Sequence, residues 1–112
     1  MTTKRRPRKR STKQLAVVWT DRALSDLEAI GDFIAADDPV SAARWVGVLM
    51  ASAERAAGTP VAGRRVPEIG RDDIREVLKR SYRIVHRVRG DRLEVLTVFE
   101  GHRLFPPDIE GT

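Results

Sequence analysis

The sequence of 112 residues contains no cysteine and only two histidines. Disulfide bonds, zinc–thiolate sites and thiol nucleophiles are excluded, because each requires a cysteine sulfur. Two histidines alone are too few to indicate a metal site, and we expect neither a metal ion nor a cofactor. No apolar run approaches the ~20 residues that cross a bilayer, and the basic N-terminus lacks the apolar segment of a signal peptide. We therefore expect a cytoplasmic protein that does not contact a membrane.

The motifs of several common enzyme classes are also absent. There is no phosphate-binding GxxxxGK[ST] loop, no HExxH zinc motif, no EF-hand loop and no readable Ser-His-Asp or Cys-His arrangement. Glu94 and Glu100 could form a carboxylate pair, but both lie at strand positions where solvated acids are ordinary, which disfavours a glycosidase. The composition, 41% apolar and 33% charged, is instead typical of one globular domain.

The net charge of +5 is concentrated at the N-terminus. Residues 1–13 contain seven of the 21 Lys and Arg residues and no acid, so the rest of the chain has 14 basic against 16 acidic side chains. We expect residues 1–13 to form a disordered basic tail, because they contain no large apolar residue after Met1. The tail either binds nucleic-acid phosphates without sequence preference or is a solubilising or misassigned start. Its candidate phosphate contacts are Lys4, Arg5, Arg6, Arg8, Lys9 and Arg10.

A short strand and two helices are predicted in the first half of the folded region. The β-branched run LAVVW at 15–19 is long enough for one buried strand, and Thr20 or Asp21 can cap the helix that follows. Asp38 and Pro39 begin the second helix, which continues to Gly58. The apolar stripe of the first helix is Leu24, Leu27, Ile30 and Ile34, and that of the second is Val40, Ala43, Val46 or Gly47, Met50, Ala53 and Ala57. The small residues of the second stripe predict a closely packed helical hairpin.

After residue 60 the apolar period changes to two, which predicts strands. They are expected at 74–80, 82–89 and 92–99, with Gly90 and Asp91 as a tight hairpin loop. Residues 64–69 are a candidate for one further strand, at a sheet edge because Pro67 cannot donate to a central ladder. His86 alternates with Ile84 and Val88, so we expect it to be structural. The last strand is expected to present Leu93, Val95, Thr97 and Phe99 on one face.

These elements predict an α+β domain over residues 14–106, in the order β-α-α-β-β-β. A two-helix hairpin packs on one face of a three- to four-stranded, mainly antiparallel sheet, and residues 107–112 form a C-terminal tail. The other face is expected to be exposed and to carry Arg75, Arg83 and Arg87. Such arginines either bind a phosphate or carboxylate, which a guanidinium can do bidentately, or are only the solvated side of the sheet.

The order of elements and three local motifs resemble the RelE/ParE superfamily of toxins from bacterial type II toxin–antitoxin modules. The matching stretches are WTDRALSDLEAIGDFIAADDPVSAARWV, GRRVPEIGRDDIREVLKRSYRIVHRV and LEVLTVFEGHRLFP. The resemblance spans roughly residues 15 to 106. It implies the fold expected above and a toxin that is held inactive by direct binding of a cognate antitoxin.

The resemblance also implies one of two activities. RelE-like toxins are ribosome-dependent messenger-RNA endonucleases that use several Lys and Arg side chains and a late tyrosine, whereas ParE-like toxins largely lack this set and poison DNA gyrase. Arg83 and Arg103 fall where the nuclease arginines would be, and Arg75 can stand for one lysine. The second lysine position is Val77, and PPDIEGT, after Phe105, contains no tyrosine. The incomplete set favours the ParE-like branch, a toxin that is not an enzyme.

Two alternatives remain open at this point. As a RelE-like toxin, the protein would be a metal-independent endoribonuclease acting on ribosomes and mRNA. Its candidate catalytic residues would then be Arg75, Arg83, His102 and Arg103. As a non-toxic binding module on the same fold, it would only bind a partner. In the favoured interpretation, the residues expected to contact the partner are Arg75, Arg83, Arg87 and Arg103.

Overall fold

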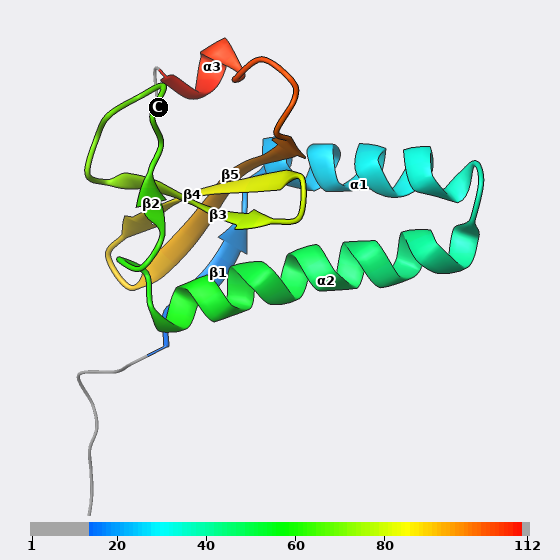
Figure 1. Cartoon of the computed structure of the whole chain (residues 1–112). Coiled ribbons are helices and arrows are strands. Elements are labelled where there is room, and N and C mark those ends of the chain that lie inside the picture. The colour runs from blue at the N-terminus through cyan, green and yellow to red at the C-terminus, as the bar shows by residue number, and fades with distance from the viewer. Residues whose placement is uncertain (1–13, 111–112) are drawn as a thin grey trace, which may run out of the picture.

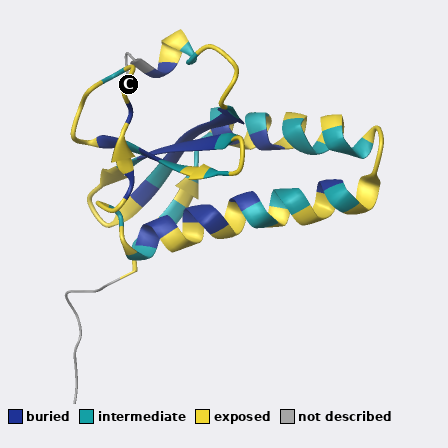
Figure 2. Cartoon of the chain, viewed as in Figure 1, coloured by how far each residue is buried: buried dark blue, intermediate teal, exposed yellow. Residues whose placement is uncertain are grey.

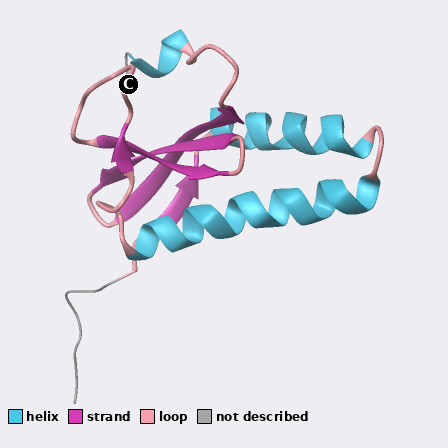
Figure 3. Cartoon of the chain, in the orientation of Figure 1, coloured by secondary structure: helices cyan, strands magenta, loops and turns pink. Residues whose placement is uncertain are grey.

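The computed structural model describes residues 14–110, which form one sheet, a helical hairpin and a short C-terminal helix (Figures 1 and 3). The strands are β1 (Ala16–Trp19), β2 (Arg64–Arg65), β3 (Ile74–Lys79), β4 (Tyr82–Arg89) and β5 (Arg92–Glu100). The helices are α1 (Asp21–Ala35), α2 (Pro39–Gly58) and α3 (Pro107–Glu110). The basic tail predicted for residues 1–13 lies outside the described residues.

The predicted α+β class is confirmed, but the predicted number of strands is wrong. The sheet has five strands in the order β1-β5-β4-β3-β2. The first strand pairs with β5 in parallel, and the remaining neighbours are antiparallel. The candidate strand at 64–69 ends at Arg65, because the chain then turns: the amides of Ile69 and Gly70 both donate to the carbonyl oxygen of Val66.

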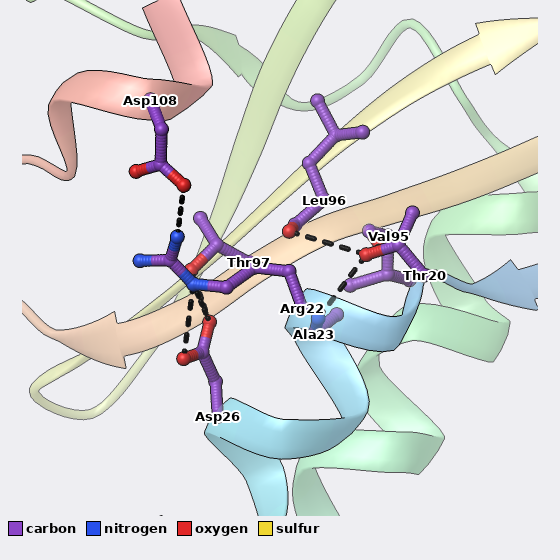
Figure 4. A network of polar contacts seen from close by, with 8 residues as sticks. All are labelled: Thr20, Arg22, Ala23, Asp26, Val95, Leu96, Thr97 and Asp108. Atoms are coloured by element: carbon purple, nitrogen blue, oxygen red, sulfur yellow. Dashed lines mark hydrogen bonds and ion pairs between the residues drawn. The ribbon is translucent and has the colours of Figure 1, made fainter.

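Each long helix begins at the residue type that its sequence predicts. The Thr20 hydroxyl accepts from the amide of Ala23 at 3.1 Å and donates to the carbonyl oxygen of Val95 at 2.9 Å, so it caps α1 and ties it to β5 (Figure 4). The Asp38 carboxylate accepts from the amides of Val40 and Ser41 at 3.1 and 3.2 Å, and Pro39 occupies the first helical position.

The helical hairpin covers one face of the sheet and forms the helix-side cluster, the main core. Its buried members are Ala23, Leu27, Leu49, Ala53, Ala56, Ala57, Ile84, Leu93, Val95 and Val98. The hairpin extends beyond the sheet (Figure 1), and the predicted stripe is wrong at Val40 and Met50, which are 76% and 44% exposed. Leu49 is fully buried instead. An offset of one residue rotates a helical side chain by about 100°, so Met50 cannot share the sheet-facing side with Leu49.

The other face of the sheet is not bare, contrary to the sequence-based expectation. It carries an outer cluster made of Val66, Ile74, Val85, Leu96, Phe99 and Ile109. Phe105 and Ile69 pack against these residues from the segments that follow β5 and β2. Within the segment expected to be a tail at 107–112, residues 107–110 form α3, and its Ile109 is buried in the outer cluster.

A β-bulge in β5 changes which side chains reach each cluster. Val85 pairs with Thr97 and His86 pairs with Val95, so Leu96 is an extra residue on β5. The expected alternation therefore fails beyond Val95: Val98 packs against the helices, and Phe99 moves to the outer cluster. The bulge delivers an aromatic ring to the face that the sequence pattern predicted to be solvated.

His86 is a buried base that forms no hydrogen bond within residues 14–110. It is 1% exposed, and neither ring nitrogen has a partner there. Much of β4 and β5 is buried (Figure 2), and His86 belongs to the buried run of β4 from Arg83 to His86. Burial, with a smaller contribution from the charge of Arg75, lowers the pKa of His86 from 6.5 to about 4.

We expect this histidine to make stability depend on pH between 7 and 5. Below pH 6.5 the unfolded chain binds a proton at His86 that the folded chain excludes until the pH approaches 4. The neutral, buried His86 therefore makes its full contribution to stability above the unfolded pKa. The free energy of unfolding falls as the pH decreases, by about 2 kcal/mol between pH 7 and pH 5. Urea denaturation at several pH values measures this slope. His86→Phe should flatten it, and an unchanged slope in that variant would assign the effect to other groups.

Candidate partner-binding site

Arg83 is the centre of a buried network of ion pairs. Its Nε donates to Glu76 at 2.7 Å, and its two terminal nitrogens donate to the two carboxylate oxygens of Glu68 at 2.8 and 2.7 Å. Glu76 is fully buried, and its second oxygen accepts from Arg64 Nε at 2.6 Å. The guanidinium fork of Arg83 thus joins two carboxylates from different segments of the chain.

Two aromatic rings enclose the same guanidinium. The Arg83 carbon Cζ lies 5.2 Å from the centre of the Phe99 ring and 5.4 Å from that of Phe105, and the two rings meet edge to face at 5.6 Å. Hydrogen bonds to Glu68 and Glu76 raise the pKa of Arg83 above its usual value in spite of its burial. The same bonds from Arg83 lower the pKa of Glu68. Arg83 is 8% exposed, so its predicted place on an exposed face is wrong.

The other two arginines of the predicted exposed face are also engaged within the chain. Arg75 lies opposite His86, two residues before Val77 of the helix-side cluster, and therefore faces the helices. Its guanidinium donates to the carbonyl oxygens of Asp72 and Gly63 at 2.9 and 3.2 Å. Arg87 does face outward, but its side chain is only 12% exposed. It pairs at 3.0 Å with Glu94, its cross-strand neighbour, so no solvated arginine face remains.

Of the predicted site residues that lie within 14–110, only His102 and Arg103 are solvent-exposed. They lie in the turn after β5, and no side-chain partner for either occurs within residues 14–110. The turn itself is well fixed: the Gly101 amide donates to the carbonyl oxygen of Ser81 at 2.6 Å, and a Cβ at Gly101 would lie 3.1 Å from that oxygen. Arg103 is thus an uncompensated positive charge at a defined place.

Arg103 borders a groove of about 530 Å³ between α1 and the segment that follows β5. The groove residues on α1 are Arg22, Asp26, Ala29, Ile30 and Phe33, and those of the C-terminal segment are Arg103, Leu104, Pro106, Pro107 and Asp108. Phe33 and Leu104 are 81% and 93% exposed. Sequence analysis missed both, although Phe33 gives a signal: it is an aromatic residue outside the apolar stripe of its helix.

A polar network holds the two walls of the groove together (Figure 4). Arg22 of α1 donates to Asp108 of α3 and, through Nε, to Asp26 at 3.1 Å. The Thr97 hydroxyl donates to the same Asp26 carboxylate from β5. The ends of α1, β5 and α3 therefore have fixed relative positions, and the groove is preformed.

The described part of the chain contains neither a cluster of metal ligands nor a membrane-spanning helix. Within residues 14–110, no three Asp, Glu or His side chains are grouped as metal ligands would be. No helix in this range is both long and apolar enough to span a bilayer.

Comparisons with known proteins identify the family. Residues 17–105 match the ParE toxin of type II toxin–antitoxin systems, parDE. The chain belongs to the ParE toxin family. "Putative toxin Y4kP" of Sinorhizobium fredii (strain NBRC 101917 / NGR234) is 37% identical over 91 residues, which cover 79% of this chain and 90% of that protein. The predicted RelE/ParE resemblance, on its ParE-like side, is confirmed.

A solved structure agrees with this assignment at the level of the fold. The chromosomal ParDE toxin–antitoxin system from P. aeruginosa contains a chain with a TM-score of 0.63 and 24% sequence identity, covering 78% of this chain and 96% of that one. Because it belongs to this family, the chain is the toxin component of a ParDE-type system, and its partner is a cognate antitoxin.

The buried and the exposed arginine should respond differently to truncation. Arg83→Ala removes the charge that neutralises Glu76 and leaves a gap between two phenylalanine rings, so it should destabilise the ParE-family domain by about 3–5 kcal/mol. Arg103→Ala removes an exposed side chain without an ion pair and should change stability by less than about 0.5 kcal/mol. Urea denaturation of both variants tests this difference. Equal stabilities would mean that the network contributes nothing.

Proposed function

We propose that this ParE-family toxin inhibits growth by poisoning DNA gyrase, and that its antitoxin neutralises it by occupying the groove between α1 and residues 103–108. Gyrase as the target follows from the ParE-like branch, and it implies action in the cytoplasm. The observation that carries the antitoxin site is the preformed groove, whose exposed Phe33 and Leu104 lie beside the unpaired charge of Arg103.

The state of the candidate catalytic residues weighs against the nuclease alternative. A nuclease arginine must reach the phosphate of a bound RNA, whereas Arg83 is enclosed by two carboxylates and two phenylalanine rings. Arg75 is bonded to backbone carbonyl groups on the helix side of the sheet. His102 and Arg103 remain exposed, but Val77 takes the place of a lysine. We infer that the protein acts by binding rather than by cutting RNA.

The groove also suggests the chemistry of the antitoxin segment. Large apolar side chains at 81% and 93% exposure are unfavourable in water and become favourable when a partner covers them. An amphipathic segment would place apolar side chains against Phe33 and Leu104 and an acidic side chain near Arg103. Such a segment neutralises the charge of Arg103 and covers the apolar surface of the groove at the same time.

The gyrase proposal predicts the response of cells to induced expression of the toxin without its antitoxin. Growth should stop with a DNA-damage response and intact transcripts, because a poisoned gyrase leaves cleaved DNA. Purified toxin should raise the yield of cleaved plasmid in a gyrase assay. Messages cut on ribosomes before any DNA damage would instead support the nuclease. Normal growth would support a non-toxic binding module.

The groove proposal predicts a loss of antitoxin affinity in Phe33→Ala. Truncating an aromatic anchor at the centre of an interface typically costs 2 kcal/mol or more of binding free energy, about thirtyfold in Kd. Because Phe33 is exposed, the substitution should change the free energy of unfolding by less than about 0.5 kcal/mol. Val61→Ala is a matched control, because Val61 is 79% exposed but does not border the groove. Calorimetry with the protein encoded by the neighbouring gene measures the affinity of both variants. Equal affinities of Phe33→Ala and Val61→Ala would refute the groove as the antitoxin site.

A further inference from the structure

The turn between β3 and β4 contains a strained residue that the proposed function does not use. Arg80 has φ of 56°, and it is the one non-glycine residue in the left-handed region among residues 14–110. It lies in a two-residue loop with Ser81, between the paired residues Lys79 and Tyr82. A side chain with a Cβ is disfavoured in this conformation, which glycine adopts freely. Strain of this kind concentrates at functional positions.

The Arg80 side chain is exposed, positively charged and held in place. Its guanidinium lies 5.7 Å from the centre of the Trp45 ring on α2, and Trp45 packs against Tyr82 with ring centres 6.0 Å apart. No carboxylate within residues 14–110 pairs with Arg80, in contrast to Arg64, Arg83 and Arg87. Stacking on an indole orients a guanidinium and leaves its N–H groups free to bind an anion.

A series of contacts links Arg80 to the groove. Tyr82, the ring at the end of the Arg80–Trp45 stack, borders the groove directly. The Gly101–Ser81 hydrogen bond joins the β3–β4 turn to the turn that carries Arg103. The two unpaired arginines therefore lie on adjoining turns, while Glu100 is the acid that this part of the groove contributes itself. A segment that fills the groove meets the positive charge of Arg103, and one that continues past Tyr82 to the β3–β4 turn reaches that of Arg80.

From this arrangement we propose that Arg80 is a specificity-determining contact for the antitoxin, whose groove-filling segment places a carboxylate on the Arg80 guanidinium. The inference rests on the proposed antitoxin site in the groove. It adds a requirement that the groove alone does not impose, a second acidic side chain positioned at the β3–β4 turn. An antitoxin that lacks this acid would fill the groove but bind less tightly, so Arg80 would separate cognate from non-cognate partners.

Arg80→Gly separates function from stability. Glycine relieves the backbone strain, so the variant should melt at a higher temperature than the unmodified toxin. It lacks the guanidinium, so its affinity for the protein encoded by the neighbouring gene should fall at least tenfold, and raised salt should shrink this difference. Arg80→Ala should lose affinity in the same way without the gain in melting temperature, because it keeps the strained backbone conformation. A residue that only forms the turn would not produce a more stable, weaker-binding variant.

Three results would overturn the inference. Unchanged antitoxin affinity in both Arg80 variants, alongside weakened binding by Phe33→Ala, refutes the role of Arg80 and leaves the groove intact. Unchanged affinity with lost toxicity would assign Arg80 to the target of the toxin and likewise refutes it. Weakened binding by Arg80→Gly but none by Phe33→Ala refutes the groove, and with it the groove-filling segment that the inference places on Arg80. Each measurement uses the toxin–antitoxin complex and holds whether or not gyrase is the target.

Discussion

The neutralisation of the Glu76 carboxylate is the constraint on which the rest of the structure depends. A fully buried carboxylate is strongly unfavourable unless charges of opposite sign and hydrogen bonds compensate it, and here Arg83 and Arg64 do so. Once paired, Arg83 can be covered by Phe105, which begins the segment leading to α3. The contact between Arg22 and Asp108 then fixes α3 beside α1 and completes the groove. The charge pair inside the sheet thus determines the shape of the surface outside.

Local signals in the sequence were sufficient for the helical hairpin and insufficient for the sheet. Thr20 and Asp38 cap helices through atoms within three residues of themselves, so a reader of the sequence can identify them. The bulge at Leu96 depends on the register of β5 against β4, and the parallel pairing of β1 joins residues about eighty positions apart. The prediction therefore gave the right class and the right helical layer, but it assigned Phe99 to the wrong face.

At the candidate site too, the sequence identifies a residue, whereas only the fold determines the surroundings of that residue. The resemblance to RelE-like toxins implies a functional arginine at Arg83, but the folded chain buries this side chain instead of exposing it. Its environment comes from Glu68, Phe99 and Phe105, which only the folded chain brings together. A two-residue sequence period separates the two faces of a sheet, but it does not show whether a face is later covered by the C-terminal segment. The same limit explains why Leu104, which lies in that segment, was missed.

The distribution of charge also indicates how a toxin can be released without refolding. The arginines that stabilise the domain find their carboxylates within the chain, as at Glu68, Glu76 and Glu94. Arg80 and Arg103 lack such partners in the described range and are exposed; Arg103 borders the groove, and Arg80 lies on the adjoining β3–β4 turn. If the antitoxin acts there, its removal takes no counter-charge from the interior, and the internal network keeps the fold intact. Degradation of the antitoxin would then uncover a preformed surface, and the toxin would become active without a conformational switch.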